Sequence, residues 1–545
     1  MIRLGAMLAL VGLAACSTAD IPEDSGVFEP VALQRAMDTQ AEATSFRETS
    51  SYEDVLGFLA VMDGLSDDLY TTSFGTSVEG RDLPLVIWSD RDTTVQAVRA
   101  SSKTRVLVFA NIHAGEVAGK EALQMLIRDL ANGQHAEWAD SLVVMIAPIY
   151  NADGNERMAY DNRPYQLGPV GGMGTRANAD GLDLNRDFMK LASPEARALV
   201  GLIREADPHV VVDLHTTNGT HMGYHLTYAP PLSPNTPDRI DRDLRDVWLP
   251  AISDAILASD DMATWHYGNV PGAFGEEASA PRGWYSFSPQ PRFSTNYVGL
   301  RGRYGLLSEA YSYATFEDRV RVSKRFTEEV LNQAWRHASA VRAAAAEADA
   351  ASVVGEDIAL RATWDALPEP VTVLLGAVDT VAHPVTGDPM LRRRDIRTPE
   401  TMLAFVRFAA SESTVAPEAY VVHYGPHQER VRDLLDAHGI AYRTEAVWGV
   451  ARQRFRVDSL RVAERPSQGV RMQEAFGAWV DVPSESGPMP RLAPALVVPV
   501  AQPLGRLVVA LLEPRSDDGV VAWAILGPEA LPKDDFAAIE RIPAP

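Results

Sequence analysis

The chain has 545 residues, 46% hydrophobic and 23% charged, and its 73 acidic residues outnumber its 50 basic ones to give a formal net charge of −23. This length exceeds what one ordinary hydrophobic core organises, so at least two domains are expected, and the composition is that of a globular protein. A strongly acidic chain is repelled by phosphates and by anionic lipids, which argues against nucleic-acid binding and against broad adhesion to a membrane.

The N-terminal segment predicts export and lipid attachment. A short apolar run over residues 4–13 is too short to span a bilayer and is typical of a secretion signal. The sequence Leu-Ala-Ala-Cys at residues 13–16 resembles a bacterial lipobox, which implies cleavage before Cys16 and acylation of its thiol. We therefore expect a signal peptide at 1–15 and a periplasmic protein whose membrane contact is a lipid anchor at Cys16. Ser17 favours the outer membrane, and an ordinary signal peptide with a chance cysteine is the alternative.

Strand and helix signals alternate over the first two thirds of the chain. Residues 16–50 are polar and predict a flexible tether, after which Ser51 is expected to cap a helix. Apolar runs predict strands at 83–88, 105–110, 142–149, 210–212 and 304–307, and helical spacing predicts helices at 117–131, 193–206 and 316–348. This alternation predicts an α/β catalytic domain over residues 51–350, with a central sheet covered by helices.

The composition changes after residue 350. Strands are expected at 371–378 and 419–423 and a helix at 428–438, followed by a Pro-rich tail. We expect residues 355–545 to form an accessory α/β domain. It offers no catalytic group of residues, so its role stays open among shielding the active site, limiting substrate size and binding a partner.

Two segments carry candidate metal ligands. Residues 111–116, Asn-Ile-His-Ala-Gly-Glu, place His113 and Glu116 three apart on the turn that leaves a strand. Open α/β sheets place their sites at such strand ends, and imidazole nitrogen and carboxylate oxygen are zinc ligands. His215, at the end of another buried strand, completes the two-histidine, one-carboxylate set of a catalytic zinc ion. A core histidine bonded to the backbone is the alternative for His215.

Two further segments carry candidate substrate and acid–base groups. Residues 181–187 and Arg176 bring guanidinium groups and a carboxamide near the ligand segments, which suits binding of a substrate carboxylate. A charged surface turn is the alternative. Glu309 ends an apolar strand, where a carboxylate without a role is costly to bury. Because the His-Glu-x-x-His motif is absent, Glu309 is the candidate general base, with helix capping as the alternative.

In this order, with Asn-Ala-Asp-Gly at 151–154 and the segment at 74–81, these motifs resemble the zinc metallocarboxypeptidases of the carboxypeptidase A type. The resemblance implies a mixed central β-sheet flanked by helices, one zinc ion per chain, and peptide substrates with a free C-terminal carboxylate. The roles that it implies are zinc ligation by His113, Glu116 and His215, orientation of His113 by Asp183, carboxylate binding by Asn185 and Arg186, polarisation of the scissile carbonyl by Arg176, and general-base catalysis by Glu309.

Several positions depart from the family pattern or leave it open. Gly115 stands where members often carry an arginine, so one substrate contact is missing or supplied elsewhere. The mobile tyrosine of the family has two candidates, Tyr285 and Tyr297. The arginines before Glu309 hint at an acidic substrate side chain, with solvated surface arginines as the alternative: Arg282, Arg292, Arg301 and Arg303.

Three functions compete at this point. The leading hypothesis is an exopeptidase that removes C-terminal residues from peptides. A zinc amidase acting on cell-wall peptides would use the same chemistry with a different pocket. A non-catalytic, peptide-binding lipoprotein is disfavoured because neither a ligand nor the base is lost. The oligomeric state stays open.

Overall fold

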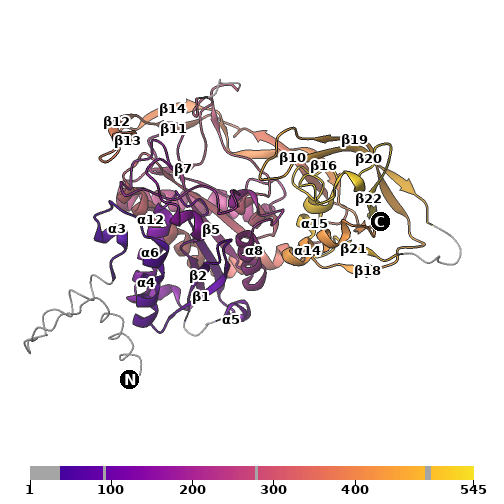
Figure 1. Ribbon diagram of the computed structural model, residues 1–545, viewed down its shortest axis with the longest axis horizontal. Helices are drawn as coiled ribbons and strands as arrows, with labels where there is room; N and C mark the ends of the chain where they lie inside the picture. The colour runs from indigo at the N-terminus through magenta and orange to yellow at the C-terminus, as the bar shows by residue number, and fades with distance from the viewer. Residues whose placement is uncertain (1–36, 90–93, 276–279, 485–492) are drawn as a thin grey trace, which may run out of the picture.

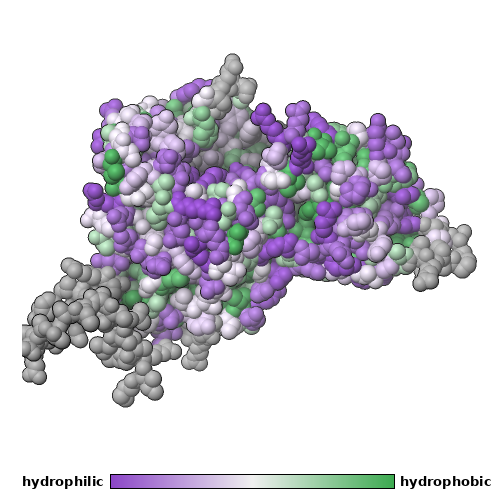
Figure 2. All heavy atoms as spheres, viewed as in Figure 1, coloured by the Kyte–Doolittle hydropathy of each residue, from purple (hydrophilic) through white to green (hydrophobic). Residues whose placement is uncertain are grey.

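The computed structural model describes residues 37–89, 94–275, 280–484 and 493–545 (Figure 1). The predicted signal peptide, Cys16 and the first part of the predicted tether lie outside these residues, so they stay predictions. Within the described ranges, no helix combines the length and the hydropathy needed to cross a membrane. Hydrophilic residues cover most of the face in Figure 2, with hydrophobic residues scattered among them.

A mixed eight-stranded sheet forms the centre of the first part of the chain. Its strands are β1 Leu69–Thr76, β2 Asp82–Trp88, β3 Thr104–Ala110, β4 Leu142–Ala147, β5 Val210–Thr217, β6 Leu226–Ala229, β7 Thr264–His266 and β9 Tyr304–Tyr311. They lie in the order β1-β2-β4-β3-β5-β9-β6-β7, and the central four, β4-β3-β5-β9, run parallel. β3, β4 and β5 are buried along their whole length, which explains their nearly unbroken apolar sequences.

Helices cover both faces of this sheet, which confirms the predicted architecture. In Figure 1, α4, α6 and α12 lie on one side of the sheet and α5 and α8 on the other. The helices of this part are α4 Tyr52–Leu65, α5 Val95–Ala100, α6 Ala118–Ala131, α7 Ala152–Glu156, α8 Pro194–Ala206, α9 Asp238–Arg242, α10 Leu249–Asp260, α11 Ser294–Leu300, α12 Phe316–Arg336 and α13 Ala338–Ala350. Ser51 caps α4 as predicted, because its side chain accepts a bond from Asp54 N.

Two predictions for this part are wrong. The single helix expected at 316–348 is broken at His337, whose backbone leaves the helical region (φ −108°, ψ 19°). The break lets α13 pack on the start of β3, where the Thr104 hydroxyl donates to Ala338 O at 2.9 Å. The flexible tether expected at 16–50 is ordered from Thr39 onward, because Thr39 caps the short helix α3 Gln40–Ala43.

The end of the predicted tether is anchored by a buried carboxylate. Glu121 of α6 accepts bonds from Thr49 Oγ1 at 2.8 Å, from Ser50 N at 2.7 Å and from Ser50 Oγ at 2.9 Å. Three donors offset the cost of burying the charge. A polar composition alone does not reveal such an anchor, since the partner lies far along the chain.

Residues 357–415 form a long two-stranded ribbon, which we call the arm. Its paired strands are β10 Asp357–Asp365 with β16 Arg407–Val415, β11 Val371–Leu375 with β14 Thr398–Met402, and β12 Val378–Ala382 with β13 Pro389–Arg393. Figure 1 shows the arm running over the first part of the chain, with β12 and β13 at its far end. Beside these pairs, β15 Ala404–Phe405 pairs with β8 Trp284–Tyr285 of the first part. The single strand expected at 371–378 is therefore wrong, because the chain turns between β11 and β12.

An antiparallel six-stranded sheet follows the arm. Its order is β18-β21-β17-β22-β19-β20. The strands and helices are β17 Ala419–Val422, α14 Gln428–His438, β18 Arg443–Glu445, β19 Arg452–Val462, β20 Gln473–Val482, β21 Ala495–Pro499, α15 Gly505–Leu512 and β22 Asp535–Ile542. The helix predicted at 428–438 is confirmed by α14. The residues after it, expected as a Pro-rich tail, form α15 and the other strands of this sheet. Buried residues of this sheet and of the first part belong to one continuous apolar core.

A buried arginine ties three segments of the first part together. Arg319 of α12 has no exposed surface. Its guanidinium donates to the carbonyl oxygens of Leu167 and Ser312 at 2.9 Å and of Gly168 and Ala314 at 2.6 Å. Burial lowers the pKa of Arg319 to about 9. These four bonds hold two connecting segments against the helix.

We predict that Arg319→Met lowers the free energy of unfolding by about 3 kcal/mol, because four carbonyls lose a charged donor and two of them, Leu167 O and Ala314 O, lose the donor described above. Urea denaturation followed by circular dichroism measures this change. Arg336→Met, at an exposed position of the same helix, is the matched control and should stay within about 0.5 kcal/mol of the wild type. Equal midpoints for both variants would show that Arg319 does not have this role.

Candidate active site

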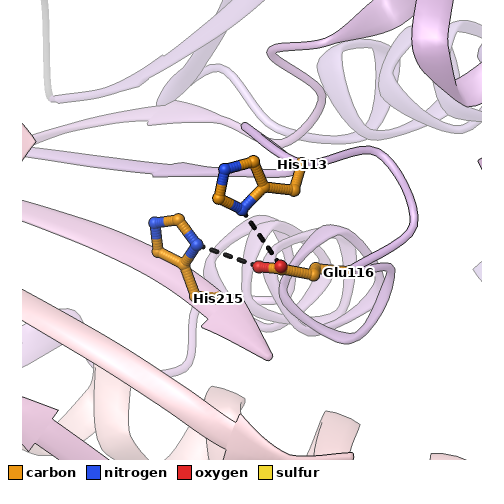
Figure 3. Close-up of side chains that lie close together, drawn as sticks. All are labelled: His113, Glu116 and His215. Atoms are coloured by element: carbon orange, nitrogen blue, oxygen red, sulfur yellow. Dashed lines mark hydrogen bonds and ion pairs between the residues drawn. The ribbon is translucent and has the colours of Figure 1, made fainter. Parts of the chain in front are cut away.

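The turn after β3 places the first two candidate ligands. Asn111 adopts a left-handed backbone (φ 66°), which asparagine tolerates better than most residues, and this turns the chain out of the sheet. Its Nδ2 donates to Ala114 O at 3.2 Å, and Glu116 N donates to His113 O at 2.9 Å. The buried turn therefore holds His113 and Glu116 in fixed positions at the C-terminal end of β3 (Figure 3).

Two neighbouring strands supply the next two residues. His215 lies on β5, which is adjacent to β3, and pairs in register with Glu309 of β9. His113, Glu116 and His215 are all buried, and one ligand atom from each lies within 4.8 Å of the other two. Three consecutive strands of the parallel region thus bring the predicted ligands and the predicted base together.

The hydrogen bonds of the two histidines test whether this set suits a metal ion. The Nδ1 atoms of His113 and His215 lie 3.0 and 2.9 Å from the two Glu116 oxygens (Figure 3). Their Nε2 atoms lie 3.0 Å from Asp183 Oδ1 and 2.8 Å from Asp213 Oδ2. A carboxylate only accepts, so each Nε2 of a neutral ring carries the proton and each Nδ1 directs a lone pair at Glu116. Acceptors that face one another this closely are stable only around a cation or around extra protons, and the set fits zinc.

The charges around these ligands shift their pKa values in opposite directions. Burial alone would raise the pKa of Glu116, but His113 and Arg163 outweigh it and hold the pKa well below its usual range. Burial alone would lower the pKa of His215, but Asp213 outweighs it and the pKa lies well above its usual value. A metal ion must displace the proton on His215, so binding weakens as the pH falls.

The remaining predicted residues surround one cavity of about 250 Å³. Seven of the eight predicted site residues line it, and the eighth, Asp183, lies behind His113. Glu309 is partly exposed to this cavity, and burial raises its pKa to about 8; His215 and Arg176 oppose this rise, whereas Glu116 supports it.

Ion pairs arrange the positive groups along the cavity wall. Arg176 Nη2 lies 2.9 Å from Asp183 Oδ2, and its Nη1 lies 3.7 Å from Glu116 Oε1. Arg186 Nη1 lies 3.9 Å from Asp183 Oδ2, and its guanidinium lies 4.1 Å from the ring centre of Phe293. Arg163 Nη2 donates to Glu116 Oε1 at 2.9 Å. The wall, together with Asp183 behind it, therefore alternates in charge from Arg163 through Glu116, Arg176 and Asp183 to Arg186.

The two tyrosine candidates are engaged away from the cavity in this structure. Tyr285 stacks on Phe405 with ring centres 4.3 Å apart, and Tyr297 is buried with its hydroxyl 2.9 Å from His438 Nδ1. Neither lines the cavity, whereas Tyr267 does. Burial raises the pKa of Tyr267 to about 12, and the negative charge of Glu309 acts in the same direction.

The four arginines before Glu309 do not line the cavity either, so they give no support to an acidic substrate side chain. Each is engaged elsewhere: Arg282 with Glu400, Arg292 with Asp518, Arg301 with His438 O, and Arg303 with Asp207. The alternative of solvated surface arginines is also wrong for three of them, because Arg292, Arg301 and Arg303 are buried.

Sequence reasoning missed three residues of this site. Asp213 lies two positions before His215 on β5, so its side chain points to the same face, and that spacing is a signal that could have found it. It also accepts a hydrogen bond from Ser294 Oγ. Arg163 and Gln468 follow no motif. Gln468 lies in the C-terminal part of the chain, that is, the residues after the arm that contain the six-stranded sheet. It accepts a hydrogen bond at 2.7 Å from the backbone N–H of Asp183.

The C-terminal part also fixes the far wall of the cavity. Arg292 N donates to Asp518 Oδ2 at 2.6 Å, and the Arg292 guanidinium lies 4.8 Å from the ring centre of Trp523. Ser294, two residues on, donates its backbone N–H to Asn185 Oδ1 at 3.0 Å. The carboxamide predicted to bind substrate is therefore oriented by a segment that the C-terminal part holds.

Comparisons with known proteins agree with this geometry. The profile of the Peptidase M14 family, zinc carboxypeptidase, matches residues 58–247. Carboxypeptidase 2 of Trichophyton rubrum is 31% identical over 143 residues, which are 26% of this chain and 23% of that protein. Carboxypeptidase Z of Mus musculus is 28% identical over 193 residues, which are 33% of this chain and 28% of that protein. The chain thus spans only about a quarter of the length of these relatives.

Among solved structures, carboxypeptidase A from Helicoverpa armigera aligns with a TM-score of 0.40 and 16% identity, over 58% of this chain and 81% of its own. The matched residues 58–247 contain the three candidate ligands and Asp183, whereas Glu309 lies beyond them. Residues 58–247 are thus similar to the zinc carboxypeptidase domain of the Peptidase M14 family, and the convergent ligand set lies within them.

Proposed function

We propose that the protein is a zinc-dependent metallocarboxypeptidase that removes C-terminal residues from peptides. One observation carries the proposal: a buried two-histidine, one-carboxylate set shares a cavity of about 250 Å³ with a further carboxylate, that of Glu309, and three guanidinium groups. Zinc held by His113, Glu116 and His215 would act as a Lewis acid on the scissile carbonyl and would lower the pKa of water. The remaining chemistry falls to the side chains of the cavity.

Binding of the substrate carboxylate is assigned to Asn185 and Arg186. Arg186 lies at one end of the alternating wall, and its guanidinium has donors beyond the one that binds Asn185 O at 2.8 Å. A terminal carboxylate suits this fork of donors and the neighbouring carboxamide. The requirement for a free carboxylate is what makes the activity that of an exopeptidase.

Bond cleavage is assigned to Glu309 and Arg176. Glu309 takes a proton from the attacking water and passes it to the leaving amine, which departs with the proton as the C–N bond breaks. Its raised pKa, about 8, makes it a stronger base than an exposed glutamate. Arg176 stays charged between Glu116 and Asp183 and stabilises the oxyanion that develops on the scissile carbonyl.

Hydrolysis of a mixed peptide library tests the function. We expect the protein to remove single C-terminal residues, to lose this activity with a zinc chelator and to regain it with added zinc, as followed by mass spectrometry. The same peptides with amidated C-termini are the matched control and should resist, because Arg186 then lacks a charged partner. Internal cleavage, or equal cleavage of the amides, would contradict the proposal. Cleavage of cell-wall peptides alone would favour an amidase instead.

We predict that Glu309→Gln lowers kcat by a factor of about 10² or more, because the amide cannot take the proton. Zinc content, measured by elemental mass spectrometry, should match the wild type, since Glu309 is not in the ligand set. Glu53→Gln, at an exposed position of α4, is the control for an equivalent charge change. A kcat near that of the wild type would show that Glu309 is not the general base.

We predict that Asp213→Asn weakens zinc binding by a factor of about 10 to 100, because His215 loses the charged partner that fixes its tautomer. Competition with a chromophoric chelator measures the affinity. Asp180→Asn, at an exposed position near the site, should leave the affinity unchanged. Equal affinities for the two variants would mean that Asp213 does not support the ligand.

A further inference from the structure

A second pocket of about 200 Å³ adjoins the catalytic cavity. It lies between the segment 160–173 and the far end of the arm, and Arg163 lines both spaces. Apolar and aromatic side chains make up much of its lining, namely Tyr160, Tyr165, Met173, His383 and Met390, and the carboxylates of Asp161 and Asp388 lie among them. The arm is bonded to this segment, because Leu391 N donates to Tyr165 O at 2.9 Å. The far end of the arm therefore forms one wall of a pocket that shares Arg163 with the catalytic cavity.

The two tyrosines are placed at a cost that packing does not explain. Tyr165 keeps 51% of its surface exposed and Tyr160 keeps 44%. Tyr165 also has a left-handed backbone (φ 68°), which is unfavourable for a bulky residue. Exposed aromatic rings at the mouth of a concave space are typical of a site that gains free energy when a ligand covers them.

Arg163 occupies the position that links the two spaces. A Cβ atom at residue 115 would lie 2.5 Å from Arg163 Nε, so Gly115 leaves the room that this guanidinium fills. One of its nitrogens is bound by Glu116, whereas its buried Nε has no hydrogen-bond acceptor among the described residues. The side chain that is absent at residue 115 is thus replaced in space by a guanidinium from another loop.

The alternating wall of the cavity gives the direction of a bound peptide. Arg186 pairs with Asp183 at one end of this wall, and Arg163 pairs with Glu116 at the other. A substrate whose terminal carboxylate binds Arg186 must extend its upstream residues past the catalytic groups toward Arg163. The second pocket, which Arg163 also lines, adjoins that end of the wall.

We propose that this pocket is a substrate subsite, which takes a hydrophobic side chain of the peptide upstream of the cleaved bond, with Arg163 donating to a peptide carbonyl on the way. The inference rests on the proposed carboxypeptidase function, which sets the direction of the peptide. It makes the arm a determinant of substrate selection. The apolar lining sets the preference for a hydrophobic residue.

The test uses acetylated pentapeptides that end in a C-terminal residue which the protein removes. The upstream positions are alanine, and in each peptide of the series one of them is replaced by phenylalanine. We expect kcat/KM to rise about tenfold for phenylalanine at one position that reaches the pocket. In Tyr165→Ala and Tyr160→Ala this preference should fall to about twofold or less. An acetylated dipeptide, which is too short to reach the pocket, should be cleaved at the wild-type rate by both variants.

Tyr424→Ala, which truncates a tyrosine that is 72% exposed in the C-terminal part, is the matched control and should keep the full preference. If the wild type cleaves all pentapeptides equally, or if the variants slow the dipeptide as much as the pentapeptides, the subsite is refuted while the carboxypeptidase stands. If no C-terminal residue is removed from any peptide, the proposed function fails and the subsite falls with it.

Discussion

The close approach of three acceptor groups is the constraint on which the rest of the site depends. Glu116 faces the Nδ1 atoms of His113 and His215 at about hydrogen-bond distance, although the bonds of both Nε2 atoms leave no proton for Nδ1 in a neutral ring. Such a set is stable only around a cation or around extra protons. The chain must hold it together against electrostatic repulsion, and the fully buried strands β3 and β5 supply that rigidity.

The same constraint explains the charges around the ligands. Asp183 and Asp213 stand behind the two imidazoles. Arg163 pairs with Glu116 Oε1, which also faces His113, and Arg176 pairs with the outer oxygen of Asp183. An arginine has five donors, so one that is held by a carboxylate still offers others to a substrate. Pairing fixes the guanidinium groups before a substrate arrives, and this reduces the reorganisation that binding and catalysis require.

Much of the first part of the chain could be predicted because its strands are buried on both faces and read as apolar runs. Their parallel C-terminal ends meet at one edge, so residues that follow them, such as His113 and His215, could be grouped without a structure. Strands such as β19 are half exposed and lack an apolar run, so the sequence after residue 438 carries no clear strand signal. Arg163, Gln468 and the buried anchor at Glu121 depend on contacts between distant segments, for which local periodicity carries no signal.

The sequence predicts an accessory domain after residue 355 that adds no catalytic group. In the structure, residues of this part support two residues of the catalytic site. Gln468 accepts the backbone bond of Asp183, and Asp518 fixes the segment that orients Asn185. The arm adds strand pairing and an apolar cluster with the first part, in which Val373 and Met402 pack beside Tyr311. A chain ending at residue 350 would expose that cluster and free both walls of the cavity. The zinc chemistry belongs to the sheet, whereas the shape of the substrate site belongs to the whole chain.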